Sequence, residues 1–228
     1  MLISIVIPVF NEESTVGKVI ERTKTALLKS KLTYEIIVVD DSSRDRSVQI
    51  AEHQGVKVYA SKEHVGKGYA LRMGFAKAKG EIIVTIDSDG SHRPEELPRL
   101  LNPILQNKAD LVIGSRFLLE KGEAAARKLN RKGVNLFNLM VKFLTGIQTS
   151  DSQSGYRAIR TKYLHSLNLK SNEYEIESEM LVKAANNGLR VIEVPISFEA
   201  RTYGKSALDP MKDGVKIFLS IVLAYLGR

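Results

Sequence analysis

Short apolar runs alternate with longer segments of mixed polarity along the first half of the chain. β-branched runs predict strands at residues 4–10, 34–39, 56–60, 82–86 and 111–114, and helices between them that end near residues 30, 54, 79 and 106. Gly80 is expected to cap the helix that ends near residue 79. Strands that alternate with helices at this spacing predict an α/β fold, with a mostly parallel sheet and helices on both of its faces.

The pattern changes in the second half of the chain. Residues 123–144 predict one long helix with a basic first half and an apolar second half. A polar loop at 149–156, a helix at 174–186, a strand at 190–198 and a final apolar helix at 209–226 follow. No repeat or linker interrupts this series, so we expect one domain with a C-terminal portion that forms a lid or faces a membrane.

Composition limits the kinds of partner and of metal site. The 228 residues are 43% hydrophobic and include no cysteine, so any metal site must use oxygen or imidazole ligands. The formal charge of +8 favours phosphates, nucleotides or an acidic membrane surface. The sequence has no aromatic-studded basic stripe, so nucleic acid is not expected as a partner. The N-terminus reads as a first strand, and no apolar stretch reaches the roughly 18 to 20 residues of a spanning helix.

Acidic side chains follow three of the predicted strands. Asp87 and Asp89 come directly after the apolar run at 82–86, and residues two apart in extended backbone point the same way. They can therefore share one divalent cation, Mg²⁺ or Mn²⁺, that also binds a diphosphate. Glu12 follows the first strand, and Asp40 and Asp41 follow the second. Turn formation or helix capping explains any one of these acids alone, but three acidic strand ends favour a ligand site at the carboxyl edge of the sheet.

Seven ordered motifs extend this picture. They are IVIPVFNEE at 5–13, EIIVVDDSSRD at 35–45, GKGYALRMGF at 66–75, DSDGSHRPEELPRLL at 87–101, GSRF at 114–117, SGYRAIR at 154–160 and EVPISFEARTYGKS at 193–206. Together they resemble the family 2 glycosyltransferases of the GT-A fold, and within them the dolichol-phosphate mannose synthases and other polyprenyl-phosphate glycosyltransferases. The resemblance implies a Rossmann-like, mostly parallel sheet with amphipathic, membrane-facing C-terminal helices. It also implies a single domain over residues 1–228, in which 1–117 bind a nucleotide sugar and 118–228 bind the acceptor.

The resemblance assigns roles to individual residues of this chain. Nucleotide-sugar contacts are expected from Pro8, Phe10, Glu12, Asp40, Asp41, Lys67, Asp87, Ser88, Asp89, Arg201 and Lys205. The metal acids are Asp87 and Asp89. Ser91 stands at the next metal-side position, where the synthases often carry glutamine, and serine is a poor substitute for an amide oxygen. His92 is assigned a solvated or phosphate-facing position in preference to a ligand role.

The remaining assignments concern the acceptor and catalysis. Acceptor-phosphate contacts are expected from Arg116, Arg127, Arg131 and Lys132, and the catalytic set is Asp89, Arg116, Asp151 and Arg201. Arg201 and Lys205 match a loop that closes over the diphosphate in the family. A surface salt bridge remains the alternative for Arg116, and a solvated basic face the alternative for the cations of the long helix. The apolar half of that helix favours an anionic lipid headgroup beside it.

These assignments imply a metal-dependent inverting transfer. The expected donor is GDP-mannose, the acceptor is a polyprenyl or dolichyl phosphate, and the protein lies peripherally on the cytoplasmic face of a membrane, where a partner subunit could supply an anchor. A phosphate monoester has a second pKa near ~6 and arrives largely ionised, so no indispensable general base is expected, and Asp151 is the first candidate if one exists. The alternatives are a soluble family 2 transferase with another nucleotide sugar and a glycan or protein acceptor, and a catalytically silent nucleotide-binding module.

Overall fold

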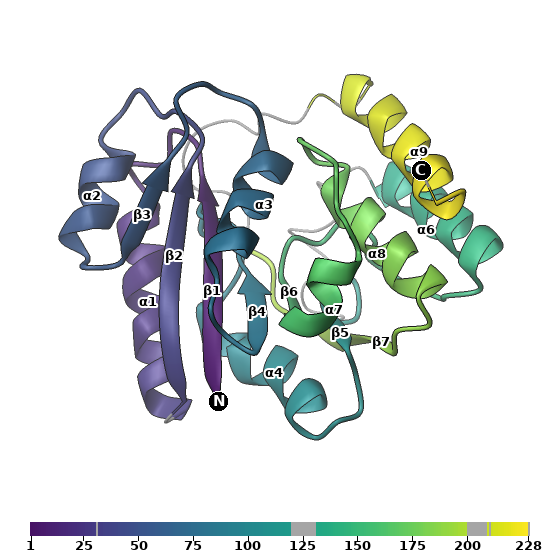
Figure 1. Ribbon diagram of the computed structural model, residues 1–228, viewed down its shortest axis with the longest axis horizontal. Coiled ribbons are helices and arrows are strands. Elements are labelled where there is room, and N and C mark those ends of the chain that lie inside the picture. Colours follow the sequence, from purple (N-terminus) through teal and green to yellow (C-terminus); the bar gives the residue numbers. More distant parts are fainter. Residues whose placement is uncertain (31, 120–130, 200–208, 210, 228) are drawn as a thin grey trace.

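The computed structural model describes residues 1–30, 32–119, 131–199, 209 and 211–227 (Figure 1). In this part of the chain seven strands form one sheet in the order β3-β2-β1-β4-β6-β5-β7. The strands are β1 (Leu2–Val9), β2 (Thr33–Asp40), β3 (Lys57–Ala60), β4 (Ile82–Thr85), β5 (Leu111–Ser115), β6 (Arg157–Arg160) and β7 (Val191–Pro195). Strand β6 runs antiparallel to β4 and to β5, and the other neighbouring pairs are parallel. The mostly parallel α/β sheet predicted from the sequence is confirmed.

Helices cover both faces of this sheet. They are α1 (Val16–Ser30), α2 (Ser47–His53), α3 (Lys67–Lys77), the 3-10 turn η1 (Pro94–Glu96), α4 (Leu97–Leu105), α6 (Arg131–Thr145), α7 (Thr161–Ser166), α8 (Ile176–Asn186) and α9 (Lys212–Tyr225). Alternate side chains of β1 point to opposite faces, so Ile5 packs in the layer with α1 and α4, whereas Val6 packs in the layer with α3 and α8. The sheet is therefore buried on both sides, as the mainly apolar run at residues 82–86 predicted.

The sequence pattern missed one segment, and one local prediction is wrong. Residues 157–166 form β6 and α7, which the sequence pattern did not predict, because a four-residue strand that begins and ends with arginine carries little apolar periodicity. Gly80 does not cap α3, since the helix ends at Lys77 and Ala78 is already extended. Gly80 instead packs against β1, where a Cβ atom would lie 2.6 Å from the backbone nitrogen of Ser4. Close backbone approach, not helix termination, therefore requires glycine there.

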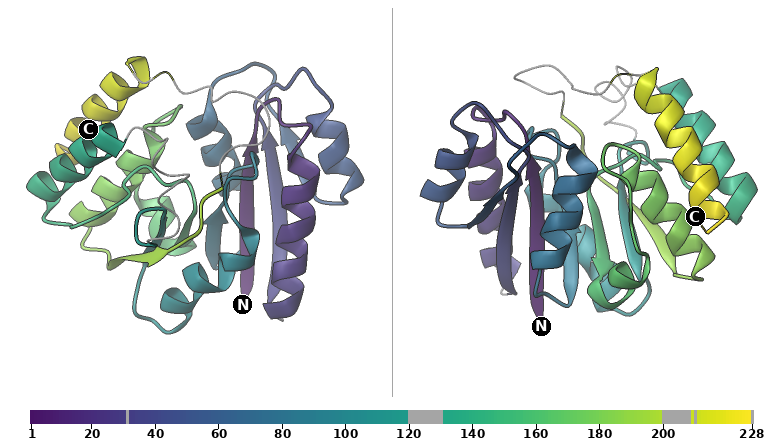
Figure 2. Two further views of the ribbon diagram at one scale, coloured as in Figure 1. Left: turned by 180° about the vertical axis from the view of Figure 1, so that it is seen from behind. Right: turned by 45° about the horizontal axis from the view of Figure 1, so that its top comes forward.

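The C-terminal helices α6 and α9 lie side by side and pack outside α8 (Figure 2). Helix α6 starts at Arg131, and the first part of the long helix predicted at 123–144 falls outside the described residues. None of the helices in the described part of the chain combines the length and the apolar composition that crossing a bilayer requires.

Candidate active site

The acidic strand ends meet because β2, β1 and β4 are neighbours in the sheet. Parallel strands place their carboxyl ends at one edge, so Asp40, Glu12 and Asp87 follow three adjacent strands at that edge. Hydrogen bonds tie these ends together. The Ser88 hydroxyl donates to the carbonyl of Pro8 at 2.8 Å, and the backbone N–H of Asp41 donates to the carbonyl of Val9 at 2.8 Å. Pro8 and Ser88 are thus structural links at the edge where we expect the nucleotide.

Asp40 and Asp41 are both buried, but their carboxylates have different partners. Asp41 accepts the backbone N–H groups of Val65 and Gly66, at 3.0 and 2.7 Å, and its Oδ2 lies 2.7 Å from Nδ1 of His64. Asp41 therefore orders the loop that leads into α3. Oδ2 of Asp40 accepts the N–H of Ser43, whereas its Oδ1 has no hydrogen-bond partner within the described structure. A buried acceptor of this kind suits a ligand N–H or O–H group.

The turn after β1 is joined to the turn after β2. The backbone N–H of Glu12 donates to the Ser47 hydroxyl at 2.8 Å, and the Glu12 carboxylate accepts the Thr15 hydroxyl at 3.0 Å. The ring of Phe10 stacks on His64 with centroids 4.0 Å apart. These contacts hold Phe10 and Glu12 beside the loop that Asp41 orders, so the residues that follow β1 and β2 lie close together.

A lysine and two carboxylates form the charged centre of the site. Nζ of Lys67, at the start of α3, lies 2.7 Å from Oδ1 of Asp87 and 2.8 Å from Oε1 of Glu177, at the start of α8. Burial alone would raise the pKa of Asp87, but the charge of Lys67 holds that pKa below its ordinary value. Burial alone would lower the pKa of Lys67, but Asp87 and Glu177 hold it above its ordinary value. The ammonium therefore stays charged and bridges two acids.

Glu177 was not predicted as a site residue from the sequence. The sequence does indicate that Glu177 lies on an apolar helix face, because positions 177, 181 and 184 share one face and Leu181 and Ala184 are apolar. A carboxylate on the apolar face of a helix is expected to have a buried partner. The identity of that partner, Lys67, depends on the tertiary structure.

Asp89 and His92 complete this centre. Oδ1 of Asp89 accepts both the backbone N–H and the hydroxyl of Ser91, at 3.0 and 2.7 Å. His92 is buried between the rings of Tyr156 and Phe198, and its Nδ1 lies 3.7 Å from Oδ2 of Asp87. The solvated position considered for His92 is therefore wrong. Burial lowers the pKa of His92, so the ring is neutral near pH 7.

The chemistry of this donor set fits a divalent cation. Asp87 and Asp89 supply carboxylate oxygens at the end of β4, and Mg²⁺ in particular binds through one or two carboxylates together with phosphate and water oxygens. Within the described residues, no three His, Cys, Asp or Glu side chains form a ready metal cluster. Gly155 lets the side chains of Asp87 and Lys67 lie directly against its backbone, because a Cβ atom there would lie 2.8 Å from Oδ2 of Asp87 and 2.7 Å from Nζ of Lys67. A metal at this site would therefore need oxygens from its substrate or from water.

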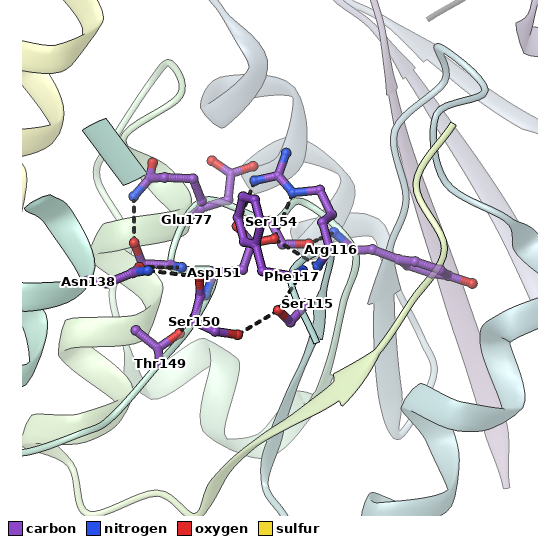
Figure 3. A network of polar contacts seen from close by, with 12 residues as sticks. Ser115, Arg116, Phe117, Asn138, Thr149, Ser150, Asp151, Ser154 and Glu177 are labelled. Carbon is purple, nitrogen blue, oxygen red and sulfur yellow. Dashed lines mark hydrogen bonds and ion pairs between the residues drawn. The ribbon is translucent and has the colours of Figure 1, made fainter. Parts of the chain in front are cut away.

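Arg116 and Asp151 form a buried bidentate pair (Figure 3). Nε and Nη2 of Arg116 donate to the two oxygens of Asp151 at 2.7 and 2.6 Å, and the backbone N–H of Arg116 donates at 3.1 Å. The rings of Phe117 and Phe198 lie 5.7 and 5.3 Å from the guanidinium carbon. The alternative of a surface salt bridge for Arg116 is therefore wrong, since Asp151 is 0% exposed.

The loop that carries Asp151 is held from several sides. Asn138, on α6, donates to the carbonyl of Ser150 at 2.8 Å and accepts the N–H of Ser152 at 3.0 Å (Figure 3). Arg157 is fully buried, and its guanidinium donates to the carbonyls of Ser152, Ser154 and Glu177 at 2.6–2.7 Å. Burial lowers the pKa of Arg157 to about 10. Neither Asn138 nor Arg157 was predicted as a site residue from the sequence, and both position the backbone of the site.

Some of the cations predicted to bind the acceptor or the nucleotide sugar lie within the described residues, and others do not. Arg131 and Lys132 lie exposed in the first turn of α6, and the Arg131 guanidinium lies 5.5 Å from the ring centroid of Phe117. Arg127, Arg201 and Lys205 fall outside the described residues.

Comparison with solved structures shows which known fold this chain adopts. The glucosyl-3-phosphoglycerate synthase of Mycobacterium tuberculosis, solved in complex with Mn²⁺, UDP and glucosyl-3-phosphoglycerate, matches with a TM-score of 0.75 and 24% identity, over 99% of this chain and 80% of that one. The same synthase with Mg²⁺ and UDP gives a TM-score of 0.73 at 22% identity, over 99% of this chain and 79% of that one. The fold is thus that of the GT-A glycosyltransferases.

Sequence comparison defines the family. The profile described as glycosyl transferase family 2 matches residues 4–167. The undecaprenyl-phosphate mannosyltransferase of Micrococcus luteus is 32% identical over 92% of this chain and 88% of that protein. The UDP-N-acetylglucosamine–dolichyl-phosphate N-acetylglucosaminyltransferase of Methanococcus voltae is 31% identical over 100% and 97%. The chain therefore belongs to glycosyl transferase family 2 and is a glycosyltransferase.

Some relatives are considerably longer. The dolichol-phosphate mannosyltransferase of Pyrococcus furiosus is 32% identical over 91% of this chain, but the match covers only 59% of that protein. The chain therefore spans about three fifths of the length of that relative.

Proposed function

We propose that this protein transfers a sugar from a nucleotide sugar onto a polyprenyl phosphate at a membrane surface, with inversion at the anomeric carbon. The observation that carries this proposal is the exposed apolar face of α6 and α9. Its side chains are Leu136, Leu139, Phe143, Val215, Phe218, Leu219 and Leu223, and Phe143 is 86% exposed. An apolar helix face bordered by cations suits an anionic lipid surface. The names of the relatives, several of which act on dolichyl or undecaprenyl phosphate, support the same acceptor.

The apolar face lies next to the proposed phosphate site. Helix α6 begins at Arg131, and both Arg131 and Arg116 lie against the ring of Phe117, at 5.5 and 5.7 Å from its centroid. Basic side chains thus extend from the lipid-facing helix to the buried Arg116. A lipid whose tail rests on α6 and α9 would have its phosphate near these cations. In this proposal residues 118–228 receive the lipid, and residues 1–117 bind the nucleotide sugar.

The donor half would use the acidic strand ends. Asp87 and Asp89 would hold the metal, which when bound stabilises negative charge on the diphosphate. Asp40, with its spare buried acceptor, would receive an N–H group of the base. Phe10, Glu12 and Ser88 would line the same edge. Arg201 and Lys205, which lie outside the described residues, are proposed to contact the diphosphate.

No general base is needed in this reaction. The acceptor phosphate is largely ionised near neutral pH, since its second pKa is near ~6. Asp151 is occupied by the two guanidinium hydrogen bonds from Arg116, so its proposed role is to orient Arg116 toward the acceptor. No hydrogen bond to another described residue uses Nη1 of Arg116, and this nitrogen can donate to a phosphate oxygen.

The proposed donor is GDP-mannose. Two of the relatives named above are mannosyltransferases, whereas a third uses UDP-N-acetylglucosamine. A carboxylate such as Asp40 accepts an N–H from guanine or from uracil, so this contact does not choose between the two bases. The donor is therefore best decided by direct competition among labelled nucleotide sugars.

The experiment offers the purified protein GDP-mannose, UDP-glucose and UDP-N-acetylglucosamine, each labelled in the sugar. Each donor is incubated with Mn²⁺ or Mg²⁺ and with vesicles that contain a polyprenyl phosphate, and label is then extracted into organic solvent. We expect organic-soluble label from GDP-mannose, and none from the Asp89→Asn variant. Transfer to water-soluble hydroxyl acceptors, with none to the lipid phosphate, would contradict the proposal.

A further inference from the structure

The ammonium of Lys67 occupies a position that competes with the proposed metal. It lies 2.7 Å from Oδ1 of Asp87, one of the two acids available to a divalent cation. The side chains of Lys67 and Asp87 are 17% and 23% exposed, so water screens their interaction only in part. Two cations beside one carboxylate repel each other. The attraction between Lys67 and Asp87 therefore weakens the binding of a divalent cation to Asp87.

Glu177 offers Lys67 a second partner that does not depend on Asp87. Its side chain is 5% exposed, and its ion-pair partner among the described residues is Lys67, at 2.8 Å. A buried carboxylate is stabilised by a cation in direct contact, so Glu177 favours retention of Lys67 whether or not Asp87 has bound a metal. Asp87, in contrast, needs a cation that either Lys67 or a metal can supply.

The backbone keeps Lys67 and Glu177 together. The N–H of Tyr69 donates to the carbonyl of Asn172 at 2.9 Å, and a Cβ atom at Gly68 would lie 2.6 Å from the carbonyl oxygen of Ser171. The start of α3 is thus packed directly on the segment before α8. Arg157 also holds the carbonyl of Glu177 at 2.6 Å. The contact between Lys67 and Glu177 therefore joins two fixed elements.

We propose that Lys67 is an exchangeable counter-ion of the metal site, and that Glu177 is the positioning residue that holds its ammonium when a divalent cation binds Asp87. Without a metal, Lys67 neutralises Asp87 and keeps the acidic centre stable. With a metal, the ammonium is retained by Glu177 and remains beside the site. The inference rests on the proposed function, because it takes Asp87 and Asp89 as the metal acids.

Direct Mn²⁺ binding tests this inference without any turnover. Free Mn²⁺ is measured by electron paramagnetic resonance during titration of the protein in the absence of nucleotide sugar. The main variant is Lys67→Met/Glu177→Gln, which removes the ammonium and its second partner together, so that Asp87 no longer has Lys67 as a counter-ion in competition with the metal. We expect it to bind Mn²⁺ about tenfold more tightly than the unaltered protein, since charges a few ångströms apart at partly screened sites interact on this order.

The single variant Glu177→Gln should act in the opposite direction. With Glu177 neutral, Lys67 has only Asp87 as a partner, so Mn²⁺ binding should weaken by about tenfold. A matched control removes an exposed pair from the same region. The variant Lys216→Met/Glu173→Gln deletes an ion pair between α9 and the segment before α8, and Mn²⁺ affinity should stay unchanged. Thermal unfolding checks that each variant is folded.

The outcomes separate this inference from the proposed function. If Mn²⁺ affinity in Lys67→Met/Glu177→Gln equals or falls below that of the unaltered protein, Lys67 does not compete with the metal, and the inference is wrong. If that result appears while Asp89→Asn abolishes both Mn²⁺ binding and transfer, the proposed function stands without it. If the unaltered protein binds no Mn²⁺ without nucleotide, the inference is wrong, because Lys67 then has no bound metal to exchange with at Asp87.

Discussion

The variant Asp151→Asn tests the buried pair at the centre of the proposed acceptor site. Asp151 receives three hydrogen bonds from Arg116, two from the guanidinium at 2.6 and 2.7 Å and one from the backbone at 3.1 Å. Asparagine has nearly the same shape but no charge, and its amide nitrogen cannot accept a hydrogen bond. The substitution therefore leaves a buried guanidinium without its counter-ion, while it changes the packing very little.

The burial of this ion pair sets the expected loss in the free energy of unfolding. Removing one partner of a buried ion pair costs about 3–5 kcal/mol, and the remaining amide oxygen places this variant near the lower end. A loss of about 3 kcal/mol lowers the folding equilibrium constant by roughly two orders of magnitude, since ~1.4 kcal/mol corresponds to tenfold. Because Arg116 also loses its orientation, kcat/KM for the lipid acceptor should fall by about 100-fold, with little change in affinity for the nucleotide sugar.

Urea unfolding followed by circular dichroism at pH 7 measures the loss of stability. The control Glu95→Gln removes an exposed pair with Arg22 and should cost less than about 1 kcal/mol. A double variant, Arg116→Met/Asp151→Leu, should recover most of the stability but no activity, because neither charge remains buried alone. A loss below about 1 kcal/mol for Asp151→Asn would refute the reasoning, and a large fall in kcat with unchanged stability would instead indicate a general base.

Three further predictions concern other parts of the structure. Gly155→Ala places a Cβ atom within 2.8 Å of Asp87, and overpacking of about 1–3 kcal/mol should weaken Mn²⁺ binding by tenfold or more in a metal titration. Arg131→Ala should raise KM for the lipid phosphate more than KM for the nucleotide sugar, and steady-state kinetics that show equal effects would count against the headgroup assignment. Hydrogen bonds from Arg190 hold the pKa of Asp110 below its ordinary value, so this stabilisation is complete above about pH 4 and is lost as the pH falls through the folded-state pKa. Asp110→Asn should therefore flatten the decline in stability below about pH 4 in urea unfolding, whereas an unchanged slope would exclude this contribution.

The sequence alone determined the class of fold and one edge of the site. β-branched, mainly apolar runs such as residues 82–86 predicted strands buried on both faces, and the alternation of strands and helices predicted a mostly parallel sheet. Acidic residues directly after three of these strands then indicated that their carboxylates lie at one edge of the sheet, because the carboxyl ends of parallel strands share that edge. These features follow from local periodicity, which a single sequence carries.

The tertiary structure decided the contacts between distant segments. The antiparallel strand β6 lies between β4 and β5, so the loop before it, with Asp151 and Gly155, lies beside the end of β4. That arrangement pairs Asp151 with Arg116, and the packing of α3 on the start of α8 pairs Lys67 with Glu177, 110 positions further along the chain. Neither pair has a local signature, because strand order and helix packing are set by how the whole chain buries its apolar surface. Residue types and their spacing are present in the sequence, whereas the partner of each buried charge exists only once the chain has folded.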